Sequence, residues 1–559
     1  MPEQVSDPIR RFHGATVPRG LEDVSHSPLY EGRFGRMFRA LAPLEPDDAD
    51  LLALAETMVE ENPEDPSNDN PDIPSGFTYL GQFIDHDLTF DPTSRLQRQN
   101  DPDALRNFRT PRFDLDSVYG SGPSDSPYLY REDGLRFGIG KTRRDEDDLP
   151  RNLAQEGEPR RALIGDPRND ENVIVSQIHL AFLKFHNRVI ESLRDDVPAD
   201  QLFEAARQVV RWHYQWLVVH DFLRRLVGED VVNDILKPDD YVAGTAGGAA
   251  TASIPKIDLK FFAWRNQPYM PVEFSVAAYR FGHSQVRPSY TLNQVVRDVP
   301  IFSPSDNPGE FEDLRGFRER PPFWVIEWNR FFEFPQAGEL QPTRRINTRL
   351  ALGLARLPAN VNPGRRSLAE LNLRRGKALG LPSGQDVARA MGVPEALILV
   401  GDALGLPGDL AARLADATPL WYYILKEAEV HGDGRRLGPV GGRIVAEVFI
   451  GLLDGDQFSY LSMRPGWRPE PGQFGAQDGD RPFEMPQLLS FAGAQIATRT
   501  GRTLADLEVD NPNIRQQHAD WRQARIARNE DPNDFEAFRQ FLIFLGAPDP
   551  GEEFDEFRS

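Results

Sequence analysis

The chain has 559 residues, 64 Lys and Arg against 86 Asp and Glu, and a formal net charge of −22 at pH 7. An acidic surface repels polyanions, which argues against a nucleic acid or an anionic membrane as partner. The chain contains no Cys, which excludes disulfides, thiolate metal sites, iron–sulfur clusters and cysteine nucleophiles. Metal binding or catalysis must therefore use His, carboxylates, Arg and hydroxyls.

The sequence carries no targeting or membrane signal. The first twenty residues lack the apolar segment of a signal peptide, and no apolar run approaches the roughly 18 residues that span a bilayer. We therefore expect a soluble monomer without a membrane span, either cytoplasmic or exported by a non-classical route.

The hydrophobic pattern predicts a mostly α fold with little β structure. Strand-like alternation is scarce, whereas helical periodicity is strong over 77–90, 171–195, 201–228, 272–287, 384–401 and 440–453. The 47 Pro and 45 Gly exceed average composition, so we expect long ordered loops between the helices. The acidic, Pro-rich segment 61–75 resembles a linker. We predict an N-terminal extension and linker over 1–74, a main body over 75–545 and an acidic tail over 546–559.

The segment 77–92, FTYLGQFIDHDLTFDP, is the first with a chemical signature. On a helix its apolar stripe consists of Phe77, Leu80, Ile84 and Leu88. Gln82, Asp85 and His86 then cluster on the opposite side, and Asp87 points elsewhere. The polar face either meets solvent or offers a base, an acceptor and a cation ligand. A zinc site is disfavoured because HExxH is absent and one His is too few.

The segment 165–193, GDPRNDENVIVSQIHLAFLKFHNRVIESL, predicts a helix with Asp170 as its N-cap. Its core stripe consists of Ile178, Phe182, Phe185, Val189 and Leu193. Glu171 falls in the same sector, either as a partner of the helix dipole or as a buried functional group. Arg168 could stabilise negative charge in a shared pocket. We interpret His179 and His186 as core histidines.

Two further segments could complete a metal site. In 272–286, Val272, Val276, Tyr279, His283 and Val286 share one helix face. His283 is then either a hydrogen-bonded core residue or an axial metal ligand, and Gly282 leaves room for a flat cofactor. In 367–382, Asn372 is either an ordinary surface residue or a group that hydrogen-bonds the far nitrogen of a ligated His.

Four motifs, GQFIDHD, GDPRNDE, YRFGH and LNLRRGKALGLP, together resemble the haem peroxidase superfamily that includes myeloperoxidase and cyclooxygenase. GPVGGRIVAEVFIGLLDGDQFSY at 438–460 resembles a later family segment, so the likeness spans roughly 75–470. The resemblance implies one large helical haem peroxidase domain that binds haem b.

The resemblance also assigns residue roles. It implies His86 as the distal base, Arg168 as its partner, and Gln82 in the distal pocket. His283 would be the axial ligand of the haem iron, and Asn372 would fix its tautomer. Arg280 and Arg375 resemble the propionate-binding arginines. The implied activity uses H2O2 to oxidise small donors, namely phenols, halides or thiocyanate, through a ferryl intermediate.

Two further properties follow from the resemblance. Asp85 and Glu171 match positions that form ester bonds to haem methyl groups, whereas Asn172 stands where a sulfonium link would require Met. A Ca²⁺ ion is expected in the loop TPRFDLDSVYGS, 110–121. Its implied ligands are Asp87, Thr110, the Arg112 carbonyl, Asp114 and Asp116. Taken alone, DLDS could equally be an acidic turn.

The alternatives to a peroxidase are a fatty-acid dioxygenase and a non-catalytic calcium-binding scaffold. Cyclooxygenase-like relatives place a radical-forming Tyr three residues before the proximal His, where this chain has Arg280. Tyr279 stands four before it, which on an α-helix turns the phenol about 100° away. We therefore favour the peroxidase. The presence of His86, Arg168, His283 and Asn372 argues against the scaffold.

Overall fold

Helices dominate the computed structural model, as the sequence predicts, and the strands of its described part are short and pair two at a time. The described residues are 34–89, 111–142, 145–153, 160–237, 255–264, 268–293, 296–305, 309, 311–321, 324–335, 339–359, 361–362, 366–496, 523 and 525. No helix within these ranges is long and apolar enough to cross a membrane.

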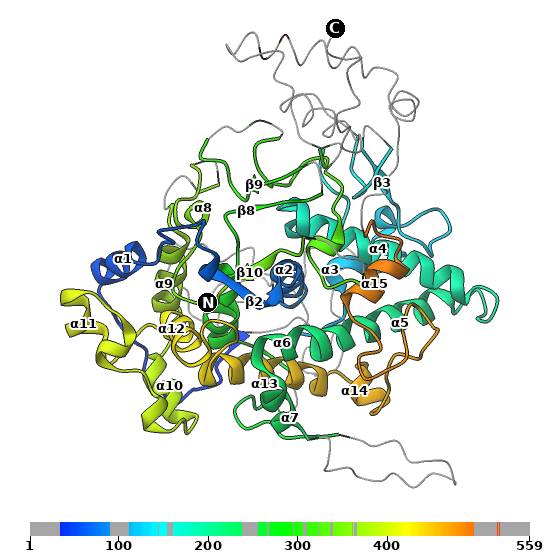
Figure 1. Ribbon diagram of the computed structural model, residues 1–559. Helices are drawn as coiled ribbons and strands as arrows, with labels where there is room; N and C mark the ends of the chain where they lie inside the picture. The colour runs from blue at the N-terminus through cyan, green and yellow to red at the C-terminus, as the bar shows by residue number, and fades with distance from the viewer. Residues whose placement is uncertain are drawn as a thin grey trace, which may run out of the picture.

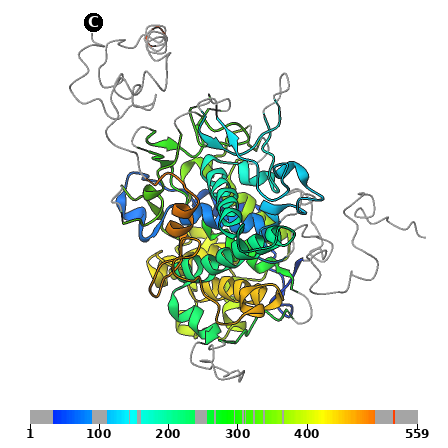
Figure 2. The ribbon, with the colours of Figure 1, turned by 90° about the vertical axis from the view of Figure 1, so that its right-hand side faces the viewer.

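Five longer helices form the centre of the molecule. They are α2 (Gly76–Leu88), α4 (Val173–Leu193), α5 (Leu202–Leu217), α12 (Leu420–Gly432) and α13 (Pro439–Gly455). α2 packs against α4, α4 against α5, and α12 against α13. In Figure 1, β8 and β9 lie at one end of the molecule and α7 and α13 at the other, with α2 between them. Figure 2 shows the green helices α4 and α5 crossing the middle of the molecule.

Shorter elements surround this centre. The helices are α1 (Asp48–Glu56), α3 (Asp116–Tyr119), α6 (Arg224–Val227), α7 (Glu229–Ile235), α8 (Leu352–Ala355), α9 (Leu368–Ala378), α10 (Gly384–Ala390), α11 (Gly408–Leu414), α14 (Tyr460–Met463) and α15 (Met485–Phe491). β1 (Phe34–Gly35) pairs in parallel with β7 (Met270–Pro271). The antiparallel pairs are β2 (Asp69–Pro74) with β10 (Pro342–Arg344), β3 (Gly140–Lys141) with β4 (Asp147–Asp148), β5 (Leu236–Lys237) with β6 (Lys256–Ile257), and β8 (Ser289–Tyr290) with β9 (Val299–Pro300).

Residues 34–74 lie against the helical body. α1 packs on α9, and β2 pairs with β10. Leu51 and Leu54 of α1 are fully buried. The predicted boundary at residue 74 thus coincides with the end of β2, which pairs with β10 of the main body. The predicted tail, 546–559, lies outside the described residues.

Three predicted helices need correction. The range 201–228 is helical, but a π-helical turn, Val218–Leu223, separates α5 from α6. The range 272–287 contains a π-helical segment, Glu273–Ala277, followed by a 3₁₀ segment, Ala278–His283. In 384–401 only α10 is α-helical, and 3₁₀ turns follow at Glu395–Leu397 and Gly401–Leu404. The hydrophobic period of a sequence predicts a helix, but it does not distinguish α-helical from π-helical or 3₁₀ hydrogen bonding, which depends on tertiary packing.

The apolar stripe of α2 is buried as predicted. Phe77, Leu80, Ile84 and Leu88 are at most 2% exposed. Phe83 stacks on Phe182 of α4 with ring centroids 4.7 Å apart and an interplanar angle of 8°. Burial of each such side chain stabilises the fold by about 1.5–3 kcal/mol. This packing fixes the rotation of α2 and hence the direction of its polar residues.

Candidate functional site

A cavity of about 630 Å³ brings together most of the predicted site residues. Gln82, Asp85 and His86 of α2 line it, together with Glu171 at the start of the α4 region. Arg280, Gly282 and His283 line it from the 3₁₀ segment. Residues almost 200 positions apart in the chain therefore face one space, as the motifs predict.

A second cavity, of about 670 Å³, lies beside the π-helical turn that follows α5. Its wall includes Trp216, His220, Tyr460 and Trp467. None of the predicted site residues lines it. We therefore assign the site to the first cavity.

His86 is held in one orientation by a neighbouring amide. Its Nδ1 donates to Asn169 Oδ1 at 2.8 Å, and Asn169 Nδ2 lies 3.0 Å from His179 Nδ1. With Nδ1 protonated, the lone pair of the neutral ring is on Nε2. Burial, with a smaller effect of the nearby Arg168 charge, lowers the pKa of His86 to about 4. The imidazole is therefore a neutral base at pH 7.

Arg168 lies beside the base but is not among the described residues that line the cavity. Its Nη2 donates to Asp166 Oδ2 at 2.8 Å and to the His86 carbonyl at 3.1 Å. Nη2 also donates to the carbonyl oxygen of Thr89. Asp166 is fully buried, so this ion pair anchors the guanidinium behind α2.

Glu171 faces the cavity next to Gln82. Gln82 Nε2 donates to Glu171 Oε1, and Asn172 Nδ2 donates to Gln82 Oε1 at 2.9 Å. Burial raises the pKa of Glu171 to about 7 against the opposing charge of Arg168. On Asp85, the carboxylate accepts from Thr89 Oγ1 at 3.2 Å.

The predicted N-cap at Asp170 is wrong. Asn172 caps α4, because its Oδ1 accepts from Val175 N at 2.9 Å. Asp170 instead ends a 3₁₀ turn, Pro167–Asp170, and pairs with Arg151 at 2.7 Å. The buried guanidinium of Arg151 thus replaces the helix terminus as the partner of this carboxylate.

His283 has the environment expected of a neutral ligand. Its Nδ1 lies 2.9 Å from Asn372 Nδ2 on α9. A 180° rotation of that amide exchanges Nδ2 for Oδ1, which would accept from a protonated Nδ1. Burial and then the Arg280 charge lower the pKa of His283 to about 3. Arg280 lines the cavity, whereas Arg375 is not among the described residues that do.

Tyr279 departs from the prediction that its phenol turns away. It lines the cavity, and its hydroxyl donates to the Gly81 carbonyl at 3.1 Å. A rotation of about 100° per residue holds for a regular α-helix. Here the helix is interrupted at Ala277, at the π-to-3₁₀ junction, which has φ −124° and ψ −72°. The break reorients every side chain that follows.

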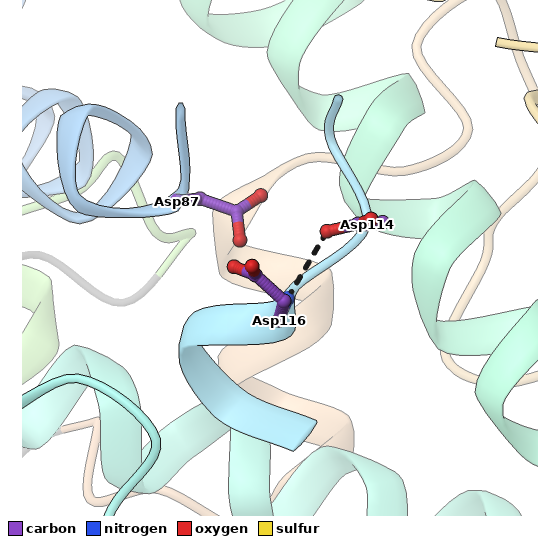
Figure 3. A group of neighbouring side chains, drawn as sticks. All are labelled: Asp87, Asp114 and Asp116. Atoms are coloured by element: carbon purple, nitrogen blue, oxygen red, sulfur yellow. Dashed lines mark hydrogen bonds between the residues drawn. The ribbon is translucent and has the colours of Figure 1, made fainter. Parts of the chain in front are cut away.

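Three carboxylates converge where a cation was predicted. Oxygen atoms of Asp87, Asp114 and Asp116 lie within 4.8 Å of one another (Figure 3). Asp116 N donates to Asp114 Oδ1 at 3.2 Å, and Leu115 N donates to Asp87 Oδ2 at 3.2 Å. These oxygens suit a hard cation. Two other residues of the predicted calcium loop are Arg112 and Thr110. Arg112 is buried, with its Nε 3.9 Å from Asp456 Oδ1, and Thr110 lies outside the described residues.

Sequence reasoning missed Asp166, Asn169 and His179 as parts of the site. Asn169 contacts a residue 83 positions away. Only its place beside Arg168 in the motif could have drawn attention to it.

Residues 94–467 match the family model described as animal haem peroxidase. Chorion peroxidase of Drosophila melanogaster is 25% identical in an alignment of length 314 that covers 53% of this chain and 34% of that protein. Thyroid peroxidase of Sus scrofa is 25% identical in an alignment of length 326 that covers 56% of this chain and 31% of that protein. The chain thus aligns with about a third of the length of these relatives.

Solved structures share the fold. Peroxidase A from Dictyostelium discoideum superposes with a TM-score of 0.56 at 15% identity, covering 86% of this chain and 96% of that one. Fatty acid alpha-dioxygenase from Arabidopsis thaliana gives a TM-score of 0.50 at 17% identity, covering 85% and 77%. The chain belongs to the animal haem peroxidase family, with α2 lying just ahead of the matched range.

The raised pKa of Glu171 predicts a carboxyl group that changes charge near neutrality. In haem-free protein Glu171 should be protonated below pH about 7 and ionised above it, because burial disfavours the anion. The infrared spectrum of wild type minus that of Glu171→Gln should show a carboxylic acid band that gives way to carboxylate bands as the pH rises. Carboxylate bands alone at about pH 5, where a group with pKa near 7 is still protonated, would contradict this.

Proposed function

We propose that the protein is a haem peroxidase that uses H2O2 to oxidise small donors. The observation that carries this proposal is that His86 and His283 line one cavity as neutral bases, each with Nδ1 beside an Asn side chain. The residues fit haem b. His283 would hold the iron through a ring nitrogen, and Phe77, Phe222 and Phe281 would supply apolar walls. Arg280 of the cavity wall would bind a propionate, and Arg375, which lies outside the described lining, is the second arginine proposed for this role.

Haem, when bound, supplies a redox-active iron that takes up the oxidising equivalents of peroxide. His86 Nε2 accepts a proton from H2O2 and returns it to the departing oxygen, which leaves as water. The charge of Arg168 favours the neutral form of His86 and stabilises negative charge as the O–O bond breaks. With a phenol as donor, two phenol molecules give one electron and one proton each, so one H2O2 and two phenols yield two waters and two phenoxyl radicals.

A fatty-acid dioxygenase is the second candidate, favoured by the position of Tyr279 in the cavity wall. Its phenol hydroxyl donates a hydrogen bond to the Gly81 carbonyl, which weakens the case for a hydrogen-abstracting radical on Tyr279. Oxygen consumption with an unsaturated fatty acid and no added peroxide, abolished in Tyr279→Phe, would select this function instead.

His86→Ala should retain haem and lose peroxide cleavage, because His283 is untouched and the proton acceptor is gone. We expect the rate of phenol oxidation under saturating peroxide to fall by about 10²–10⁴-fold. The measurement is stopped-flow absorbance after H2O2 addition, with the exposed His431→Ala as the matched control. Turnover of His86→Ala at the wild-type rate would show that the base is misassigned.

We further propose that Asp85 and Glu171 form ester bonds to haem methyl groups. Each bond joins a carboxyl oxygen to a methyl carbon and consumes one H2O2, which is reduced to two waters. Acidified organic solvent should therefore leave haem on peroxide-treated wild type but extract it from the double variant Asp85→Asn, Glu171→Gln. Complete extraction from the wild type would contradict the proposal.

Asp87, Asp114 and Asp116 are proposed to bind Ca²⁺ and to brace α2. One carboxylate oxygen of each residue lies within 4.8 Å of the others, and hydrogen bonds from Leu115 N, Asp116 N and Ser117 Oγ hold the Asp87 and Asp114 carboxylates in place. Prolonged chelation should remove about one Ca²⁺ per chain, as counted by atomic emission, and shift the haem absorption band, because His86 directly precedes Asp87. Asp116→Asn should weaken calcium binding, whereas Asp145→Asn, at an exposed turn, should not. Unchanged haem spectra after calcium removal would disprove the brace.

A further inference from the structure

We propose that Arg315 forms a subsite at the mouth of the haem cavity that binds the carboxylate of an aromatic donor. This inference rests on the proposed peroxidase function and names the donor class that the site would select. Nothing in the sequence motifs points to Arg315, which lies in the loop 311–321 far from each of them.

The Arg315 guanidinium is anchored at Nε, whereas its Nη2 has no hydrogen-bond partner among the described residues. Its Nε donates to Asp313 Oδ2 at 2.7 Å, and its backbone N donates to Asp313 Oδ1 at 3.2 Å. Asp313 is 1% exposed, so this anchor is a buried carboxylate. Arg315 Nη2 is also buried and has no hydrogen-bond partner among the described residues. A buried guanidinium N–H without an acceptor is costly, and the residue lines the cavity.

The loop that carries Arg315 is joined to the distal wall by backbone hydrogen bonds. Gly316 N donates to the Glu171 carbonyl at 3.0 Å, and Phe317 N donates to the Asp170 carbonyl at 2.6 Å. A Cβ on Gly316 would lie 1.8 Å from the Asp170 carbonyl oxygen, so only glycine permits this contact. Arg315 is therefore fixed beside Glu171, on the His86 side of the cavity.

Partly exposed apolar side chains line the same cavity as Arg315. Phe317 is 53% exposed and has a left-handed backbone, with φ at 54°. Val361 is 43% exposed, and both residues line the cavity. A cavity wall that carries both an exposed ring and a guanidinium N–H without an acceptor suits a ligand with an aromatic body and a carboxylate.

Charge supports an anionic ligand at this position. Among the described cavity-lining residues the cations are Arg280 and Arg315. Arg280 belongs to the segment of His283 and donates from Nε to the Ser275 carbonyl at 2.9 Å, which places it with the proximal group. Arg315 is thus the cation on the side where donors would meet the base.

The test compares two phenols that differ in a carboxylate, 4-hydroxyphenylacetate and 4-methylphenol, as donors for the haem-loaded protein. Arg315→Gln should raise the KM for the acid at least about tenfold relative to the KM for 4-methylphenol, because one charge-assisted contact is lost. Arg315→Lys should restore part of the preference. Arg160→Gln, whose arginine pairs with Glu319 outside the cavity, should leave both KM values as in wild type.

Other outcomes separate this inference from the proposed function. If wild type oxidises neither phenol, the peroxidase proposal fails. The subsite is then tested by itself, by titrating the haem-loaded protein with 4-hydroxyphenylacetate in the absence of peroxide and measuring the shift of the haem absorption band. In that titration Arg315→Gln should weaken the Kd by about the same factor. Equal changes for both phenols, or haem loss with an unchanged KM ratio, would overturn the inference, the latter assigning Arg315 to a propionate.

Discussion

The burial of one face of α2 against α4 is the constraint on which the rest of the site depends. Phe83 stacks on Phe182, and Leu80 and Ile84 are at most 1% exposed, so the helix has one rotation about its axis. Because side chains follow the helical period, Gln82, Asp85 and His86 then face the cavity. Asp87 lies on another side of the helix, close to Asp114. Hydrophobic packing therefore brings together the proposed base His86, the proposed ester-forming Asp85 and the carboxylate of Asp87. Arg168 lies on the outer side of this group and pairs with Asp166.

Burial explains the chemistry of the site as well as its geometry. Desolvation is the main reason why the pKa values of His86 and His283 fall and that of Glu171 rises. Both imidazoles are thus neutral at pH 7, and Glu171 is about half ionised there. A cavity that imposes neutrality favours two basic imidazoles over cationic ones, and it keeps a carboxyl group poised between acid and anion. The Asn side chains beside both rings then decide which nitrogen is basic.

Local periodicity predicted the parts of the site that lie on regular α-helices. The apolar stripe of α2 alone indicated the direction of His86. It did not predict the break just before Tyr279, because a π-to-3₁₀ junction leaves no periodic trace in the sequence. It also failed to identify Asn172 as the cap of α4, since Asp170 and Asn172 are equally suitable residues and the choice was made by Arg151, which lies 19 positions before Asp170. The contacts of Asn169 with His86, and of the loop that carries Arg315 with Glu171, join distant parts of the chain, so periodicity does not predict them.

The acidity of the chain and the cation at the cavity mouth act over different ranges. A net charge of −22 opposes the approach of an anionic donor, but exposed charges are screened beyond about 8 Å at physiological ionic strength. A guanidinium N–H in direct contact with a carboxylate inside the cavity is screened far less. Salt should therefore speed the encounter of an acidic donor with the protein more than it weakens the bound contact. Selectivity that comes from direct contact with Arg315 should persist at ionic strengths that abolish the long-range repulsion. This persistence distinguishes a binding subsite from a general electrostatic bias of the surface.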